Sequence, residues 1–230
     1  MKNKTFLIII SIILVLQLAW IYYLINNISK VEVIKKEDTI VLTETDFIKD
    51  HIKKIQNSVL YVNDLNNKKE GSGFILTSDG IILTLNSNIQ KNNDFDFRFL
   101  GKSKVYEVKK RDSENDLALV QIGEVNLKPC SFAQEDTNIS LGEKVYVLGS
   151  DKDGKYVFGQ GIVRHISGKT DILGDPIFNG APIFNSKGDI IGIGKVNNKL
   201  LDIILINNIK DFIDLWQQNL LLKKHLDGYF

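Results

Sequence analysis

The stretch Thr170–Ile193 reads T-D-I-L-G-D-P-I-F-N-G-A-P-I-F-N-S-K-G-D-I-I-G-I. Its second half predicts a β-hairpin, because apolar runs at Pro182–Phe184 and Ile190–Ile193 flank the turn sequence Asn185–Gly188. Its first half is interpreted as a loop, because three residues that favour turns punctuate it: Gly174, Pro176 and Gly180. The stretch therefore belongs to a domain built from short strands and turns.

The chain around this stretch continues the same pattern of short strands separated by turn signals. Six strands are predicted in the first half, at Ser58–Asn63, Gly71–Leu76, Ile81–Leu85, Phe95–Leu100, Lys104–Lys110 and Leu117–Ile122. After a polar connection at Gly123–Leu141, five more are predicted at Lys144–Leu148, Val157–Ile166, Pro182–Asn185, Asp189–Val196 and Leu200–Ile206. This spacing predicts an all-β fold of two packed antiparallel β-barrels, with one strand of the second barrel short or missed.

Two helices are predicted beside the barrels. Apolar residues recur at helical spacing from Phe47 to Ile55, before the first strand, and again over Asn208–Leu222 at the end. His51 lies on the apolar face of the first helix and is interpreted as a packed histidine. His165 is interpreted as a histidine on a strand surface.

An apolar segment, Phe6–Ile25, opens the chain, interrupted only by Ser11 and Gln17. At about 1.5 Å per residue it is long enough to span a hydrocarbon core of ~30 Å. A secretory signal peptide is the alternative, since Lys2 and Lys4 precede the segment. Such a peptide has an apolar region of only about 7–15 residues and a cleavage site of small residues, and neither is present. The sequence predicts a retained membrane anchor at residues 1–25, then a stem with the short helix at 26–57, then the β-domain at 58–230.

Composition excludes several classes of function. The formal net charge of +1 gives no basic footprint for nucleic acid. The single cysteine, Cys130, cannot form an intramolecular disulfide or build a metal site, and is interpreted as a buried, inert thiol. With three histidines and no metal-binding or nucleotide-binding motif, neither a metal nor a cofactor is expected.

Several runs, in order along the chain, resemble the trypsin-like serine proteases of the HtrA/Deg type. Thr170–Ile193 aligns without a gap with T-D-x-x-x-N-P-G-N-S-G-G-P, an apolar strand and N-x-x-G-x-apolar-apolar-G-I. Gly71–Thr84 resembles G-S-G-F-I-I-x-x-D-G-Y-I-L-T, and Arg111–Val120 resembles D-P-x-T-D-L-A-L-L-x-I. Leu141–Gly149 resembles V-G-x-W-V-x-A-I-G, and Gly161–Val163 resembles the S-G-I-V strand. The resemblance covers Ser58–Leu222 and implies the trypsin-like double barrel.

The same alignment implies a degenerate catalytic triad. Ser87 falls at the histidine position of the family's T-x-x-H, Asp116 falls at the aspartate position, and Asn179 replaces the nucleophilic serine. The oxyanion-hole N–H groups would come from Asn179 and Ile177, where the family has glycine in place of the isoleucine. Acyl transfer needs a nucleophile, an imidazole and an orienting carboxylate, and of these three only the carboxylate remains. The three positions are expected to lie within reach of one another in the cleft between the barrels.

The resemblance therefore implies a membrane-anchored pseudoprotease that acts as a binding or scaffold module, with protein or peptide ligands in the inter-barrel cleft. Two alternatives stay open: a serine-type hydrolase rewired around Ser87, and a structural subunit of a homo-oligomer. The family's PDZ module is not expected here, because residues 194–230 are too few for a further domain. Lysines on both sides of the apolar segment leave its orientation undecided by charge. The family favours a single-pass envelope protein with the domain outside the cytoplasm.

Overall fold

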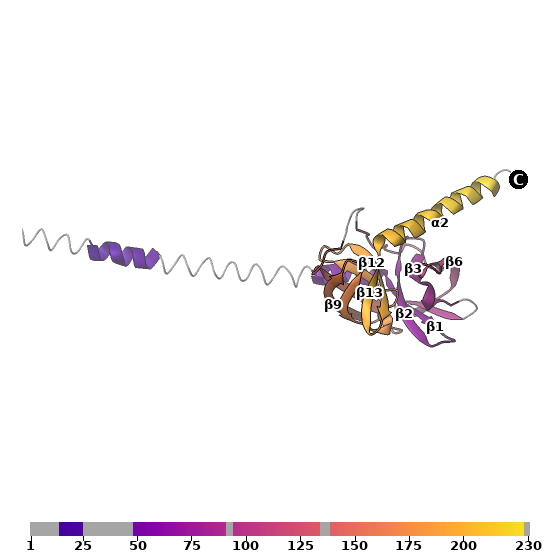
Figure 1. The fold of residues 1–230 in the computed structure, drawn as a ribbon, viewed down its shortest axis with the longest axis horizontal. Helices are drawn as coiled ribbons and strands as arrows, with labels where there is room; N and C mark the ends of the chain where they lie inside the picture. The colour runs from indigo at the N-terminus through magenta and orange to yellow at the C-terminus, as the bar shows by residue number, and fades with distance from the viewer. Residues whose placement is uncertain (1–13, 25–47, 91–93, 134–138, 228–230) are drawn as a thin grey trace, which may run out of the picture. The chain divides into compact units, whose positions relative to one another are not determined.

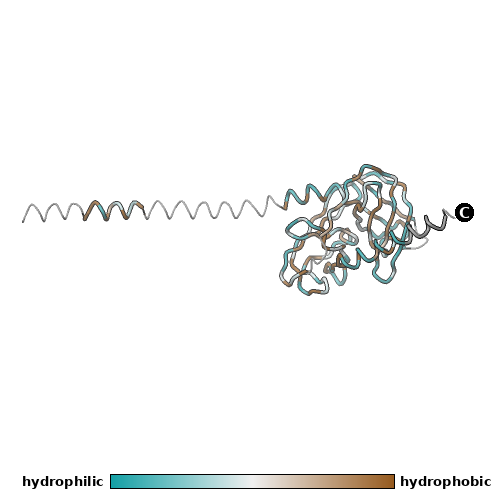
Figure 2. The backbone as a smooth tube through the Cα atoms, turned by 90° about the horizontal axis from the view of Figure 1, so that it is seen from above, coloured by the Kyte–Doolittle hydropathy of each residue, from teal (hydrophilic) through white to brown (hydrophobic). Residues whose placement is uncertain are grey.

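The computed structural model describes residues 14–24, 48–90, 94–133 and 139–227, with side chains up to residue 218. The chain divides into two units, Met1–Lys49 and Asp50–Phe230, and each is described by itself. In the first unit, residues 14–24 form a mostly apolar helix (Figure 2). No helix within the described residues is both long and apolar enough to cross a bilayer. Residues 1–13 and 25 of the predicted anchor and residues 26–47 of the predicted stem lie outside the described part of the chain.

The second unit is mostly β-structure and contains two sheets (Figure 1). The first sheet has seven antiparallel strands in the order β5-β4-β1-β2-β3-β7-β6. Their bounds are β1 Val59–Asp64, β2 Lys69–Ile75, β3 Ile81–Leu85, β4 Phe95–Phe99, β5 Lys102–Lys104, β6 Tyr106–Asp112 and β7 Leu117–Ile122. Apolar side chains from these strands, among them Leu60, Ile82 and Phe97, form one buried core.

The prediction that the first barrel is closed is wrong, because backbone hydrogen bonds do not join the two ends of the first sheet. The predicted strand Lys104–Lys110 starts at the last residue of β5 and continues into β6, and these two strands lie at opposite ends of the sheet order. Only Val105 separates them, which is too short for a hairpin turn that would let them pair. The two ends of the sheet therefore meet through the covalent chain at Val105, and the sheet curls without closing by backbone hydrogen bonds.

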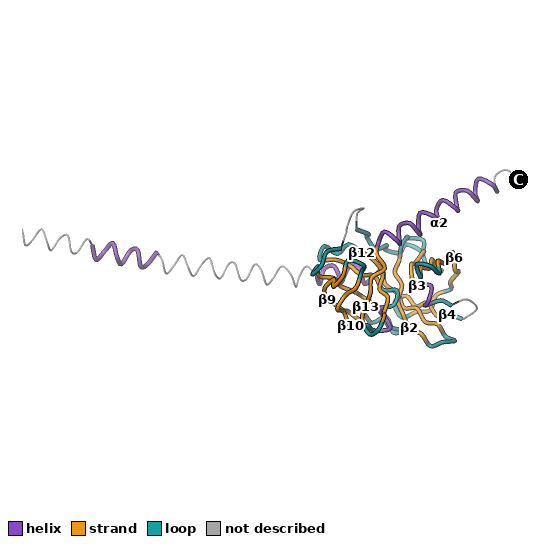
Figure 3. The backbone as a smooth tube through the Cα atoms, viewed as in Figure 1, coloured by secondary structure: helices purple, strands orange, loops and turns teal. Residues whose placement is uncertain are grey.

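The second sheet is a closed barrel of six strands in the order β10-β13-β12-β11-β8-β9 (Figure 3). Their bounds are β8 Lys144–Ser150, β9 Tyr156–His165, β10 Lys169–Leu173, β11 Pro182–Asn185, β12 Ile190–Asn197 and β13 Leu200–Leu205. Its core includes Val145, Val147, Ile183, Ile191 and Leu201. The closed second barrel predicted from the sequence is confirmed.

Strand β10 corrects the interpretation of Thr170–Leu173 as part of a loop. Buried and exposed residues alternate along this strand, but its polar and apolar residues do not follow that alternation. The polar Thr170 is buried, while the apolar Leu173 is 77% exposed. The hydroxyl of Thr170 donates to the carbonyl of Leu201, which satisfies its buried polar atom. The strand missed in the second barrel is therefore β10.

Both predicted helices beside the sheets are present. Residues 48–55 are helical and continue into a 3-10 turn, η1 (Gln56–Ser58). Helix α2 spans Ile206–Asp227, longer than predicted, and its first turns pack on the barrel through the buried Ile209 and Phe212. Lys110 of β6 donates to the carbonyl of Phe212 at 3.2 Å and lies over its ring. These contacts connect α2 to the first sheet.

Candidate functional site

Ser87 lies in the 3-10 turn η2 (Asn86–Asn88), which begins where the buried strand β3 ends. Its backbone N–H donates to Asp116 Oδ1 at 2.7 Å, and its Oγ donates to Asp116 Oδ2 at 3.0 Å. The structure therefore brings together the residues at two of the three predicted positions. The side chain of Ser87 is exposed, so its hydroxyl faces solvent.

Asp116 ends the tight turn between β6 and β7 with a positive φ of 57°. Aspartate is among the residues that adopt this left-handed conformation most readily. The turn is fixed by Asp112, whose Oδ1 accepts the N–H groups of Glu114 and Asn115, and whose Oδ2 accepts the Asn115 amide. Burial acts to raise the pKa of Asp112, but these hydrogen bonds hold it below its usual range. Contacts within the turn thus contribute to the orientation of Asp116.

Lys195 is the residue that the sequence analysis missed. Its Nζ lies 2.8 Å from Asp116 Oδ2, although Lys195 belongs to β12 of the barrel and Asp116 to the first sheet. The Asp116 carboxylate is mostly buried, with 13% of its side chain exposed, against 46% for Lys195. The Lys195 ammonium therefore pairs with the carboxylate that the sequence analysis places at the aspartate position of the triad. The only available sequence signal was a lysine directly following the apolar run Ile190–Gly194.

Asn179 follows the 3-10 turn η3 (Pro176–Phe178) and uses its side chain to hold the local backbone. Its Oδ1 accepts the N–H of Val196 at 2.8 Å, and its Nδ2 donates to the carbonyl of Pro176 at 3.2 Å. Its own carbonyl accepts the N–H of Ser72 and the amide of Asn88, both from the first sheet's half of the domain. Asn179 is therefore a structural hydrogen-bonding centre at the junction of the two sheets.

The two N–H groups at the predicted oxyanion-hole positions already have acceptors within the chain. The N–H of Ile177 donates to Asp175 Oδ1 at 2.9 Å, which caps the turn η3. The N–H of Asn179 donates to the carbonyl of Pro176 at 3.1 Å. An oxyanion hole needs donors that point at the place where the negative charge develops. In this conformation neither N–H group is available for that purpose.

A cavity of about 480 Å³ adjoins these residues and is the inter-barrel cleft of this domain. Ser87 and Asn179 both line it, and the remaining lining residues are Lys68, Lys69, Glu70, Asn88, Pro176, Lys195 and Val196. Lys68 takes a positive φ of 52° at the tip of the β1–β2 turn. In that turn Asp64 accepts the N–H groups of Asn66 and Asn67, so it repeats the arrangement of the Asp112 turn.

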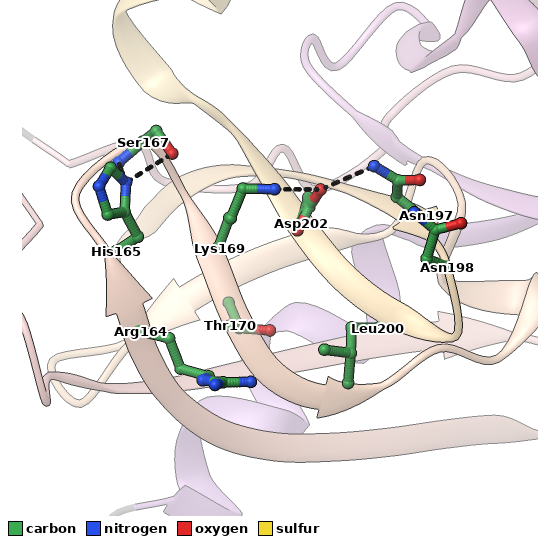
Figure 4. A pocket seen from close by; sticks show the side chains of 9 residues that line it. All are labelled: Arg164, His165, Ser167, Lys169, Thr170, Asn197, Asn198, Leu200 and Asp202. Carbon is green, nitrogen blue, oxygen red and sulfur yellow. Dashed lines mark hydrogen bonds and ion pairs between the residues drawn. The ribbon is translucent and has the colours of Figure 1, made fainter.

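A second pocket, of about 390 Å³, lies between the β9–β10 and β12–β13 hairpins of the barrel (Figure 4). Lys169 lies 4.0 Å from Asp202, whose other partner is the amide of Asn197. Arg164 also lines this pocket, and His165 turns toward Ser167, with Nδ1 2.8 Å from its Oγ. His165 is thus on the barrel surface and lines this pocket rather than the cleft.

The other residues singled out from the sequence lie away from the cleft. His51 packs against Gly188 in the β11–β12 turn, and burial lowers the pKa of its imidazole. Cys130 is half-buried rather than fully buried as expected; desolvation of its thiol raises the pKa to about 12, with a hydrogen bond to Ser58 acting in the opposite direction. Within the described residues, no group of three histidine, cysteine or acidic side chains could hold a metal ion. Histidine 225 has no described side chain.

A family model for the trypsin-like peptidase domain matches residues 71–193, more than half of the chain. The chain belongs to the trypsin-like peptidase family. The matched region of this trypsin-like protein runs from β2 to β12, so it includes Ser87, Asp116 and Asn179.

The proteins that this trypsin-like chain resembles include DegP-like proteases and Deg5. It is 29% identical over 135 residues to a probable periplasmic serine endoprotease DegP-like of Pseudomonas putida, and 28% identical over 135 residues to one of Hahella chejuensis. The alignments cover 54% of this chain but only 28% and 29% of those relatives. The crystal structure of Deg5 matches with a TM-score of 0.65 and 20% identity, over 74% of this chain and 93% of that one. This last likeness concerns the fold alone.

Proposed function

We propose that this trypsin-like protein is a catalytically inactive, membrane-anchored member of the HtrA type that uses its inter-barrel cleft as a binding or scaffold module. The observation that carries the proposal is that Asn179 makes structural hydrogen bonds. At the position of the nucleophile, its side chain bonds to Val196 and Pro176, and its N–H group is taken up within η3. A carboxamide is not a nucleophile at neutral pH, and here it holds the backbone together.

The surroundings of Asp116 support the same proposal. In the family the carboxylate at this position orients an imidazole. Asp116 instead accepts two hydrogen bonds from Ser87 and forms an ion pair with Lys195. A lysine ammonium carries three donors and no acceptor, so it cannot take a proton from a nucleophile. Losing members of a triad costs on the order of 10⁶ in turnover.

The test is hydrolysis of casein and labelling by a serine-reactive fluorophosphonate, using the full chain in a neutral detergent. We expect neither cleavage nor labelling, and no change for Asn179→Ala. An active HtrA-type protease assayed under the same conditions serves as the positive control. Cleavage of casein by the unmodified chain would refute the proposal.

One observation favours a second candidate, a hydrolase rewired around Ser87. Its hydroxyl donates to Asp116, and an exposed serine beside a carboxylate is a conceivable nucleophile–base pair. The two candidates differ in one measurement. A rewired hydrolase would be labelled by the fluorophosphonate, and Ser87→Ala would abolish the labelling while Asn179→Ala would not.

The proposed anchor rests on the apolar sequence of residues 6–25, and the extracytoplasmic location on the periplasmic relatives. We expect the full chain to stay in the membrane pellet after extraction with alkaline carbonate. A mature N-terminus located beyond residue 25 would instead indicate a cleaved signal peptide.

A further inference from the structure

Several backbone N–H groups on the cleft wall formed by η3 and β12 already donate hydrogen bonds within the chain, so they are not free to bind a ligand. The N–H groups of Val196, Asn179 and Ile177 donate to Asn179 Oδ1, the Pro176 carbonyl and Asp175 Oδ1. A peptide that docks by adding a strand needs free backbone donors and acceptors on such a wall. Recognition in this cleft must therefore come mainly from its side chains.

The side chains that line the cleft carry an excess of positive charge. Lys68, Lys69 and Lys195 line it with a single carboxylate, Glu70, so the lining residues sum to +2, of which Asp116 offsets one unit through its ion pair with Lys195. The whole chain has a formal net charge of only +1. Glu70 already accepts a hydrogen bond from the hydroxyl of Tyr61 at 2.9 Å. Positive charge is thus concentrated at the cleft.

Two of these lysines are available to a ligand. Among the residues that the structure describes, Lys68 and Lys69 have no hydrogen-bond or ion-pair partner for their ammonium groups. Both are exposed: Lys68 ends the β1–β2 turn, which Asp64 fixes by accepting two N–H groups, and Lys69 is the first residue of β2. Lys195 has one partner, Asp116, and an ammonium has three donors.

We propose that the cleft binds an acidic peptide segment, whose carboxylates pair with the ammonium groups of Lys68, Lys69 and Lys195. This inference rests on the proposed function and names its class of ligand. Lysine ammonium groups are point charges on flexible stems, so they select negative charge without demanding one backbone geometry. A cavity of about 480 Å³ holds a few side chains of such a segment.

An acidic peptide fits the lining better than a nucleic acid does. Single-stranded nucleic acids are bound by a basic groove together with aromatic side chains on which bases stack. The described lining of the cleft contains no aromatic residue. Its charge suits a short run of carboxylates instead.

Fluorescence anisotropy with the full chain in neutral detergent tests the proposal. The probe is a fluorescein-labelled peptide of alternating glutamate and serine, and the matched control replaces each glutamate by glutamine. We expect binding of the glutamate peptide only, weakening between 50 and 200 mM salt because exposed ion pairs are screened over roughly 10 Å. Equal binding of the two peptides would overturn the proposal.

Two double variants locate the binding. Lys68→Gln with Lys69→Gln removes two exposed cations of the cleft, and we expect affinity to fall at least tenfold. Arg164→Gln with Lys169→Gln removes two cations from the other pocket (Figure 4), and we expect affinity to stay within twofold. A loss of affinity only for the Arg164 and Lys169 variant would assign binding to the other pocket and refute the proposal. Equal losses of affinity for both variants would indicate unspecific charge attraction and would also refute it. Tighter binding of a single-stranded oligonucleotide would also overturn it.

Mass spectrometry of the peptide after the binding measurement separates this inference from the proposed function. An intact and bound peptide supports both. An intact peptide that does not bind refutes the acidic ligand and leaves the absence of catalysis standing. A cleaved peptide refutes the proposed function itself.

Discussion

Lys195 and Asp116 form an ion pair between the two sheets, with 2.8 Å between Nζ and Oδ2. The same carboxylate also accepts the N–H and the hydroxyl of Ser87. Both carboxylate oxygens of Asp116 therefore already have partners in Ser87 and Lys195. Neither of these residues can act as a general base for a nucleophile. If the triad is lost as proposed, a variant designed to restore catalysis would also need a change at Lys195.

Introducing a triad should therefore require a change at Lys195. Asn179→Ser alone should give no activity, because a serine without an imidazole keeps its proton. Adding Ser87→His and Ile177→Gly supplies the ring and the more permissive backbone, but Asp116 still pairs with Lys195. We expect Lys195→Ser, added to these three, to raise fluorophosphonate labelling at least tenfold.

Lys199→Ser on the same triple variant is the control, since this lysine lies on the β12–β13 turn and does not line the cleft. If both additions raise labelling equally, the ion pair is not what prevents catalysis. Turnover should remain weak in every variant, because one missing oxyanion donor alone costs about 10²–10³.

Gly180 should tolerate no side chain. It has a φ of 85°, and an added Cβ would lie 2.1 Å from the carbonyl oxygen of Ser72. Gly142 has a similar φ of 78° with no atom within 4 Å of an added Cβ, so Gly142→Ala measures the backbone strain alone. We expect about 1 kcal/mol for Gly142→Ala and more than about 2 kcal/mol for Gly180→Ala, from urea denaturation. Equal losses would mean that the contact with Ser72 relaxes.

The half-buried His51 should make the domain less stable in mild acid. Burial and the nearby Lys54 lower the pKa of its imidazole in the folded state. Unfolding therefore takes up a proton, and the contribution is complete above the unfolded pKa of about 6.5 and is lost as pH falls below it. One proton gives a slope of at most about 1.4 kcal/mol per pH unit.

The free energy of unfolding, measured from pH 7.5 to 5.5, checks this prediction. We expect His51→Gln to flatten the profile. An identical slope for His51→Gln and the unmodified chain would assign the acid sensitivity to other groups.

Cys130 should be inert toward alkylation in the folded protein. Burial raises the pKa of its thiol to about 12, and the thiolate is the reactive form. We expect iodoacetamide at pH 8 to react roughly a thousandfold more slowly with the folded chain than with the chain in guanidinium. Because Cys130 is the only cysteine, the mass change reports this site alone. Comparable rates in both states would show that the thiol is accessible and ionised.

The fold was predictable where the polarity of the side chains agrees with their burial. Strands β3 and β7 have the predicted bounds, because each is a nearly continuous apolar run that lies buried inside the first sheet. Strand β10 was not, because Thr170 points inward and Leu173 outward, against their polarity. The division at Val105 was also hidden, since nothing in the local pattern marks the place where the chain changes from one end of the sheet to the other.

The sequence motifs predicted which residues belong to the candidate site but did not predict the contacts that these residues make. Ser87, Asp116 and Asn179 were assigned from aligned runs, and their proposed equivalence to a triad stays a prediction. The partner of Asp116 could not be assigned, because Lys195 reaches it across the junction of the two sheets. The internal acceptor of the Ile177 N–H depends on the conformation of η3, which its composition does not specify.

The joint at Val105 has a consequence for how this domain could fail. Val105 is 83% exposed, and it is the only residue between β5 and β6. A proteolytic nick there would release both edges of the first sheet at once, and free edges are templates for strand-to-strand aggregation. The closed second barrel offers no comparable edge. A chain nicked at Val105 should therefore aggregate through its first half while its second half stays folded.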